Sequence, residues 1–237
     1  FSQSIDVLKF KIEDKGVDGL GTIVTKIRIQ PSSQNQADWT NTIAGVRIKK
    51  GENVVSVNSV DITDTYIDIN IIASNLVIAD NTIDEITFGI YLKNTGLINE
   101  THKLGFKVSG TSHGFVSDGS GTAFATSFGS DIEGNDQTIN VLISNLKFAT
   151  NKPPTSVNAN TNFEVEVEAV DVNNNRDYDA THSVTLTRSF GTGNLTSGTT
   201  LTKDISNGLC AWDDIQYDKA GSFKDRKSTR LNSSHGK

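Results

Sequence analysis

The sequence predicts an all-β chain built as two tandem antiparallel β-sandwich domains, the second of them truncated. Apolar residues alternate with polar residues in many short runs, which is the periodicity of half-buried strands. Clusters of Gly, Asn, Asp and Ser separate these runs and supply turns at short intervals. No stretch carries the apolar stripe of an amphipathic helix. Together these observations favour two sandwiches over a mixed or helical fold.

The first domain, residues 1–138, contains five alternating runs. Their apolar residues mostly lie two positions apart, so that each set shares one face of a strand. In chain order the runs are Leu8, Phe10 and Ile12; Ile23, Ile27 and Ile29; Ile67, Ile69 and Ile71; Ile86, Phe88, Ile90 and Leu92; and Leu104, Phe106 and Val108. A segment of this length can bury a core of its own.

The second domain, residues 139–224, begins with an expected strand at Ile139, Val141 and Ile143. Its clearest strand covers residues 163–170, where Phe163, Val165, Val167 and Ala169 alternate with three Glu residues. Val184 and Leu186 mark a further strand. The domain is shorter than the roughly 100 residues of a complete seven-stranded sandwich. We therefore expect its last strand to be missing.

Residues 225–235 read like a translated sequencing adapter. We expect residues 225–237 to be an artefactual, disordered tail and the natural sequence to end near Lys224. The chain opens at Phe1 and contains no Met. We therefore expect an internal fragment of a longer polypeptide.

The net charge argues against two classes of partner. The chain has 22 Lys and Arg residues against 28 Asp and Glu residues, and without residues 225–237 the balance is 18 to 27. A negative surface repels phosphate backbones, so we expect no nucleic-acid partner. No apolar segment approaches the roughly 20 residues that cross a bilayer, so we expect no membrane insertion. Cys210 is the single cysteine, which excludes an intrachain disulfide.

Several short motifs carry a resemblance to known modules. Asp171-Val172-Asn173-Asn174-Asn175 follows a strand, Asn207-Gly208 precedes the strand that holds Trp212, and an Ala-Gly corner follows at residues 220–221. This pattern resembles bacterial immunoglobulin-like modules of the Big or invasin type, although Asn174 replaces the usual turn Gly. The resemblance implies an immunoglobulin-like second domain that lacks its last strand.

The first domain is similar to modules found beside such domains in very large secreted bacterial proteins with C-terminal sorting domains. The residues that carry this similarity include Asp18-Gly19-Leu20, Trp39 and His113-Gly114-Phe115. It implies an extracellular or cell-surface location, attached to the outer membrane. The implied partners are neighbouring domains of the same parent chain and an extracellular glycan or protein.

A non-catalytic spacer or adhesive unit of a large secreted or cell-surface bacterial protein is therefore the expected function. Serine chemistry would need a nucleophile beside a base, and no Gly-x-Ser-x-Gly motif occurs. The histidines are scattered singly, so we do not expect an enzyme. The alternative is a carbohydrate-binding accessory module of a secreted hydrolase.

Two features suggest ligands. Asp171, Asn173, Asn175, Asp177 and Asp179 place oxygen side chains at every second position of a loop, as calcium loops do. Arg176 stands where such loops need Gly, and His182 stands where they need a bidentate Glu. A plain hairpin turn is therefore the favoured interpretation, and calcium is the only cofactor that the sequence suggests.

Trp39 is the candidate glycan residue. An exposed aromatic ring on a sheet can stack on a sugar ring. Burial in a sandwich core is the competing interpretation, and we favour structural roles for both Trp39 and Trp212.

Overall fold

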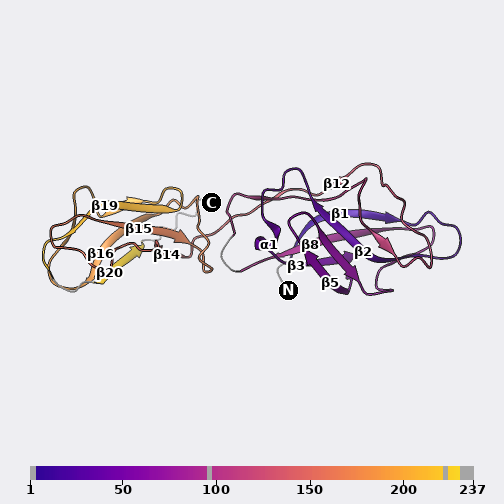
Figure 1. Cartoon of the computed structure of the whole chain (residues 1–237), viewed down its shortest axis with the longest axis horizontal. Helices are drawn as coiled ribbons and strands as arrows, with labels where there is room; N and C mark the ends of the chain where they lie inside the picture. The colour runs from indigo at the N-terminus through magenta and orange to yellow at the C-terminus, as the bar shows by residue number, and fades with distance from the viewer. Residues whose placement is uncertain (1–3, 95–97, 221–223, 230–237) are drawn as a thin grey trace, which may run out of the picture. The chain divides into compact units, whose positions relative to one another are not determined.

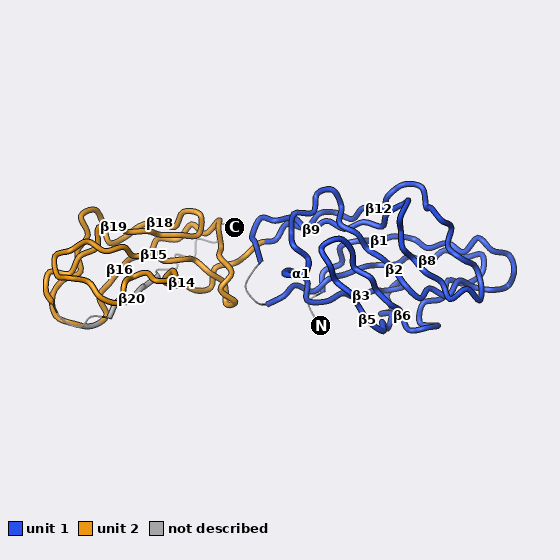
Figure 2. Tube along the Cα trace, in the orientation of Figure 1, with its two compact units in different colours: residues 1–139 blue, residues 140–237 orange. Residues whose placement is uncertain are grey.

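The computed structural model describes residues 4–94, 98–220 and 224–229. The chain divides into two compact units, residues 1–139 and 140–237 (Figure 2). Both units consist of antiparallel strands (Figure 1), and α1 (Trp39–Thr42) is a single helical turn. The predicted all-β sandwich fold class is confirmed. Within the described ranges no helix is long and apolar enough to span a membrane.

Unit 1 holds two main sheets. One has the strand order β1-β8-β3-β4, and the other has the order β12-β10-β2-β6-β5, with β7 and β11 also paired to β2. The strands β9 and β13 form a separate ladder. The bounds are β1 (Ile5–Glu13), β2 (Thr22–Pro31), β3 (Ile43–Lys50), β4 (Asn53–Val54), β5 (Val57–Ile62), β6 (Ile67–Ile71), β7 (Val77–Ile78), β8 (Ile83–Leu92), β9 (Lys103–Leu104), β10 (Phe106–Val108), β11 (Val116–Ser117), β12 (Ile132–Glu133) and β13 (Gln137–Thr138).

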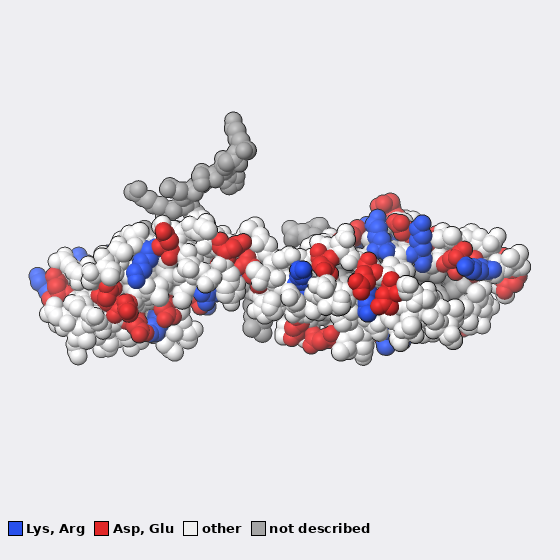
Figure 3. All heavy atoms as spheres, turned by 90° about the horizontal axis from the view of Figure 1, so that it is seen from above, with Lys and Arg blue, Asp and Glu red and all other residues white. Residues whose placement is uncertain are grey.

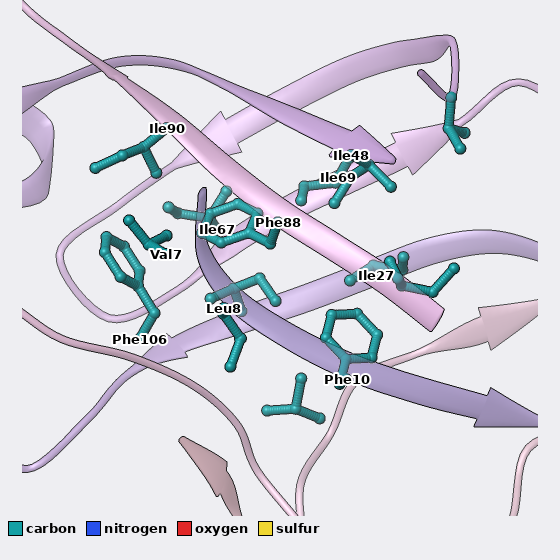
Figure 4. Packing of buried hydrophobic residues seen from close by; sticks show 14 of the residues in the cluster. Val7, Leu8, Phe10, Ile27, Ile48, Ile67, Ile69, Phe88, Ile90 and Phe106 are labelled. Carbon is teal, nitrogen blue, oxygen red and sulfur yellow. The ribbon is translucent and has the colours of Figure 1, made fainter. Parts of the chain in front are cut away.

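The core of unit 1 lies between these sheets. Alternation on β1 buries Leu8 and Phe10 while it leaves Lys9 exposed. Phe88 on β8 faces the same interior and packs edge-on against Phe106, with ring centroids 5.4 Å apart. Figure 4 shows these apolar side chains directed toward one another from strands of both sheets. Burial of this apolar surface is the main driving force for the sandwich.

The phase of β2 differs from the prediction at one end. Val24 is buried rather than Ile23, whereas Ile27 and Ile29 are buried as expected. The start of β2 pairs with β7, and its later part pairs with β6 from Lys26 onward. The strand therefore changes partner near its middle, and the buried set shifts by one residue there.

Unit 2 packs a four-stranded sheet, order β14-β15-β19-β17, against a three-stranded sheet, order β18-β16-β20. Val165 and Val167 on β15 point inward with Trp212 on β19, and Val184 on β16 closes the core from the other sheet. The bounds are β14 (Asn145–Phe148), β15 (Phe163–Val170), β16 (Ser183–Phe190), β17 (Leu195–Ser197), β18 (Thr202–Asp204), β19 (Leu209–Tyr217) and β20 (Lys224–Thr229).

Two expectations for unit 2 need correction. Residues 225–229 belong to β20, which pairs with β16 in antiparallel register, so they are not a disordered tail. The hydrogen bonds of a β-ladder join backbone groups, so a strand of almost any sequence can form them. Here β20 pairs with the edge of β16, and it thus takes the place of the last strand that was expected to be missing. The rest of the expected tail, residues 230–237, lies outside the described residues.

The prediction of a strand at Ile139, Val141 and Ile143 is wrong. Residues 139–144 form an irregular connection, although Ile139 and Val141 are buried.

Candidate functional site

The acidic loop after β15 is a turn stabilised by its own side chains. The Asp171 Oδ1 atom accepts the backbone N–H groups of Asn173 and Asn175, both at 2.8 Å. Its Oδ2 atom accepts the Asn175 side-chain amide, also at 2.8 Å. Asn174 adopts a φ of 67°, the left-handed conformation that Gly adopts most readily and that Asn tolerates. Asp171 therefore acts as a turn acceptor, as the favoured interpretation expected.

The remaining residues of the loop do not converge with Asp171. Asp177 is 3% exposed, and its Oδ2 atom accepts the Ile143 N–H at 2.7 Å. Asp177 and Asp179 each bring a carboxylate oxygen within 4.8 Å of the other. In the described part of the chain, Asp171 does not join them in a group of three carboxylates. Since Asp171, Asp177 and Asp179 do not all bring carboxylate oxygens within 4.8 Å of one another, the described residues do not gather all five predicted ligands around one calcium ion.

Trp39 is buried and cannot stack on a sugar. Its exposed fraction is 0%, and its ring stacks on Phe106 with centroids 4.9 Å apart. The indole Nε1 donates to the Asn35 Oδ1 atom at 2.9 Å. Asp38 caps the single turn α1 through the Asn41 N–H, which fixes Trp39 at the start of the turn. The prediction of Trp39 as a glycan residue is therefore corrected, because this side chain belongs to the core.

The chemically reactive residues of unit 2 are also structural. Trp212 is 1% exposed and donates from Nε1 to the Thr200 carbonyl at 2.9 Å. Cys210 is buried beside it, and burial raises the pKa of its thiol to about 11. Since the thiolate is the nucleophile and the metal ligand, this thiol is inert near neutral pH.

A groove that the sequence analysis missed lies beside β1 in unit 1. Its volume is about 470 Å³, within the range of small-ligand and peptide sites. The lining residues come from β1, from the start of β2, from β10 and β12 of the second sheet, and from the long loop between β11 and β12. It consists of Phe10, Lys11, Ile12, Glu13, Lys15, Thr22, Val108, Phe115, Thr122, Ala123, Phe124, Ala125, Ser127, Phe128 and Ile132.

Aromatic packing holds the loop wall of this groove in place. The His113 ring stacks on Phe128 with centroids 3.9 Å apart, and Phe115 and Phe124 meet edge-on at 5.6 Å. His113 Nδ1 accepts the Phe115 N–H at 3.0 Å, so the proton of the neutral ring lies on Nε2, where it donates to the Ala125 carbonyl at 2.8 Å. His113 and Phe115 precede β11, and Phe124 and Phe128 lie in the Gly- and Ser-rich loop after it. These closely spaced aromatic residues were the sequence signal for this site.

Charged side chains form local pairs on the surface. Arg47 and Lys49 both contact the Asp6 carboxylate, at 2.6 and 2.9 Å, and hydrogen bonds from both hold the pKa of Asp6 below its usual value against the opposing effect of burial. Figure 3 shows acidic and basic side chains intermixed on the visible face of each unit. This face therefore offers no broad basic patch of the kind that binds nucleic acid.

Comparison with known proteins adds no relative. No family model, no curated protein sequence and no solved structure matches the chain.

Proposed function

We propose that the chain is a non-catalytic spacer or adhesive segment of a large secreted or cell-surface bacterial protein. The observation that supports this proposal most directly is that each unit has a hydrophobic core of its own. The side chains most suited to chemistry serve those cores and their turns. Trp39, Trp212 and Cys210 are buried, and Asp171 stabilises a turn.

The proposed function is mechanical. In unit 1, β8 is paired on both sides, with β1 from Ile5 to Glu13 and with β3 from Ile43 to Lys50. Hydrogen bonds between antiparallel strands run perpendicular to the strands, so a pull along the strands must break many of them together. Modules of this kind hold a distant binding or catalytic domain away from the cell, and their partners are neighbouring domains of the same parent chain.

Single-molecule force spectroscopy on the whole chain tests the mechanical proposal. We expect two separate unfolding events. At about 3.5 Å per extended residue, unit 1 should release about 490 Å of chain and unit 2 about 340 Å, less the folded length of each. A chain that extends smoothly, without two such events, would contradict a role as a spacer.

The carbohydrate-binding alternative loses the residue on which it depended. Trp39 is the stacking ring that the sequence suggested, and it is fully buried. Binding of the whole chain to insoluble polysaccharide, abolished by Phe128→Ala rather than by Trp39→Ala, would revive this alternative at the groove, where Phe128 is 37% exposed. We expect no such binding.

A further inference from the structure

The groove in unit 1 runs along an open strand edge. β1 is the terminal strand of its sheet, with β8 as its one ladder partner among the described residues. Four consecutive residues of this strand, Phe10 to Glu13, line the groove. Successive side chains of a strand point to opposite faces, so a space that all four residues reach lies along the strand edge rather than over one face.

The hydrogen-bonding phase of β1 shows which backbone groups face this space. The Asp14 N–H donates to the Thr82 carbonyl at 2.9 Å, and the Glu85 carbonyl accepts from Gly51 on the far side of β8, at 3.0 Å. Pairs in an antiparallel ladder alternate between bonded and unbonded, so the N–H and C=O groups of Lys11 and Glu13 point away from β8. Within the described ranges no protein group satisfies them.

One end of the same edge is closed. The Gly134 N–H donates to the Phe106 carbonyl of β10, in the second sheet, at 2.9 Å. A Cβ atom at Gly134 would lie 2.1 Å from the Val7 carbonyl oxygen of β1, so Gly alone allows this close approach. Gly134 therefore bridges the two sheets near Val7, and the edge of β1 is open from Phe10 onward.

The side chains around the open stretch define the occupant. Phe10 and Ile12 point inward, and the partly exposed Phe128 and Ile132 continue this apolar side of the groove. The outward face of β1 carries Lys9 and Lys11, and Lys15 lies just beyond the strand. Lys9 and Lys15 already pair with Glu85 and Glu13, both at 3.4 Å, so Lys11 is the cation of this stretch for which no ion pair is found among the described residues. A strand added here would place alternate residues over the apolar side and the remaining residues beside the lysines.

We propose that β1 binds an extended peptide segment of another polypeptide as an added strand, and that this segment alternates apolar and acidic residues. Unpaired backbone donors and acceptors at two-residue spacing are matched by a peptide backbone, and the lysines complement its acidic side chains. The proposal rests on unit 1 alone and does not depend on the spacer function. Loss of peptide binding would leave the force measurement unchanged.

A labelled octapeptide with the sequence Phe-Glu-Val-Glu-Val-Glu-Ala-Val, the pattern of β15, is a suitable probe. Fluorescence anisotropy with the whole chain should show saturable binding. Lys11→Pro removes one outward N–H without breaking the β1–β8 ladder, and it should weaken binding about tenfold or more. The matched control is Lys11→Ala, which removes the same ammonium group but keeps the outward N–H, and it should weaken binding clearly less than Lys11→Pro does.

Two further probes separate the peptide from other occupants. The same peptide with Lys in place of Glu should bind at least about tenfold more weakly, and a peptide N-methylated at alternate residues should lose binding in one of its two registers. Ala123→Trp fills the groove from an exposed position and should abolish binding while circular dichroism stays unchanged.

Three results would overturn the proposal. Binding that survives both Lys11→Pro and N-methylation in either register would show that no strand is added. Binding of a small apolar dye or a glycan, but not of the peptide, would make the groove a small-molecule site. No saturable binding of the peptide to the folded chain would also refute it.

Discussion

Replacing Trp39 by Ala tests most directly whether this residue is structural. The substitution removes a fully buried indole, its stacking on Phe106 and its hydrogen bond to Asn35. Buried Trp or Phe to Ala substitutions cost about 3–5 kcal/mol, so unit 1 should lose about this much of its free energy of unfolding. Trp39→Phe keeps a stacked ring but loses the N–H donor. The Asn35 oxygen still accepts the Gly105 N–H at 3.2 Å, so we expect a loss of about 1–2 kcal/mol.

The two tryptophans make the assay selective. Unit 1 holds Trp39 and unit 2 holds Trp212, the two Trp residues of the chain. In the Trp39 variants, fluorescence during urea unfolding reports unit 2, which should be unchanged, while far-ultraviolet circular dichroism reports both units. The reasoning would be refuted if Trp39→Ala cost unit 1 less than about 1 kcal/mol, because such a value is typical of surface substitutions rather than of core cavities.

Three further predictions concern the acidic loop after β15, strand β20 and the pH dependence of stability. Asp171→Ala should lower the melting temperature of unit 2, and millimolar Ca²⁺ should not raise that of the unmodified chain; a Ca²⁺-dependent rise removed by Asp177→Ala would contradict the turn interpretation. A chain that ends at residue 220 lacks β20, and the Trp212 fluorescence transition should then fall to lower urea, since the β16 edge loses its ladder. The Thr22 hydroxyl holds the pKa of Asp14 below its ordinary 3.8. The stability that this carboxylate contributes is therefore complete above that pH and is lost as the pH falls through the lower folded value. Acid titration of the unmodified chain against Asp14→Asn should show this dependence, and parallel acid unfolding curves would exclude it.

Periodicity predicted most of the fold because side-chain alternation follows directly from strand geometry. Phe163 to Val170 behaves as expected, with its apolar set buried. The failures occur where alternation carries no information about partners. The expected strand at Ile139 is buried but lacks a continuous ladder, and residues 225–229 are paired by their backbone whatever their side chains.

The candidate sites were harder to predict because exposure depends on tertiary contacts. Nothing local to Trp39 distinguishes a ring that faces a sugar from one that stacks on Phe106, more than sixty residues away in sequence. The groove brings β1 together with a loop about 110 residues later in the chain. Only the aromatic residues of that loop hinted at it, since Phe124 and Phe128 are unusual among Gly and Ser.

The Gly134 contact has a consequence for molecules crowded at high density. In the spacer protein proposed above, neighbouring modules would lie at high local concentration, where exposed strand edges can pair with one another and aggregate. The close contact of Gly134 with Val7 covers the first part of the β1 edge. The open part of this edge is then the stretch from Phe10 to Glu13, which can pair with a short peptide segment but offers few backbone partners to the sheet of another copy.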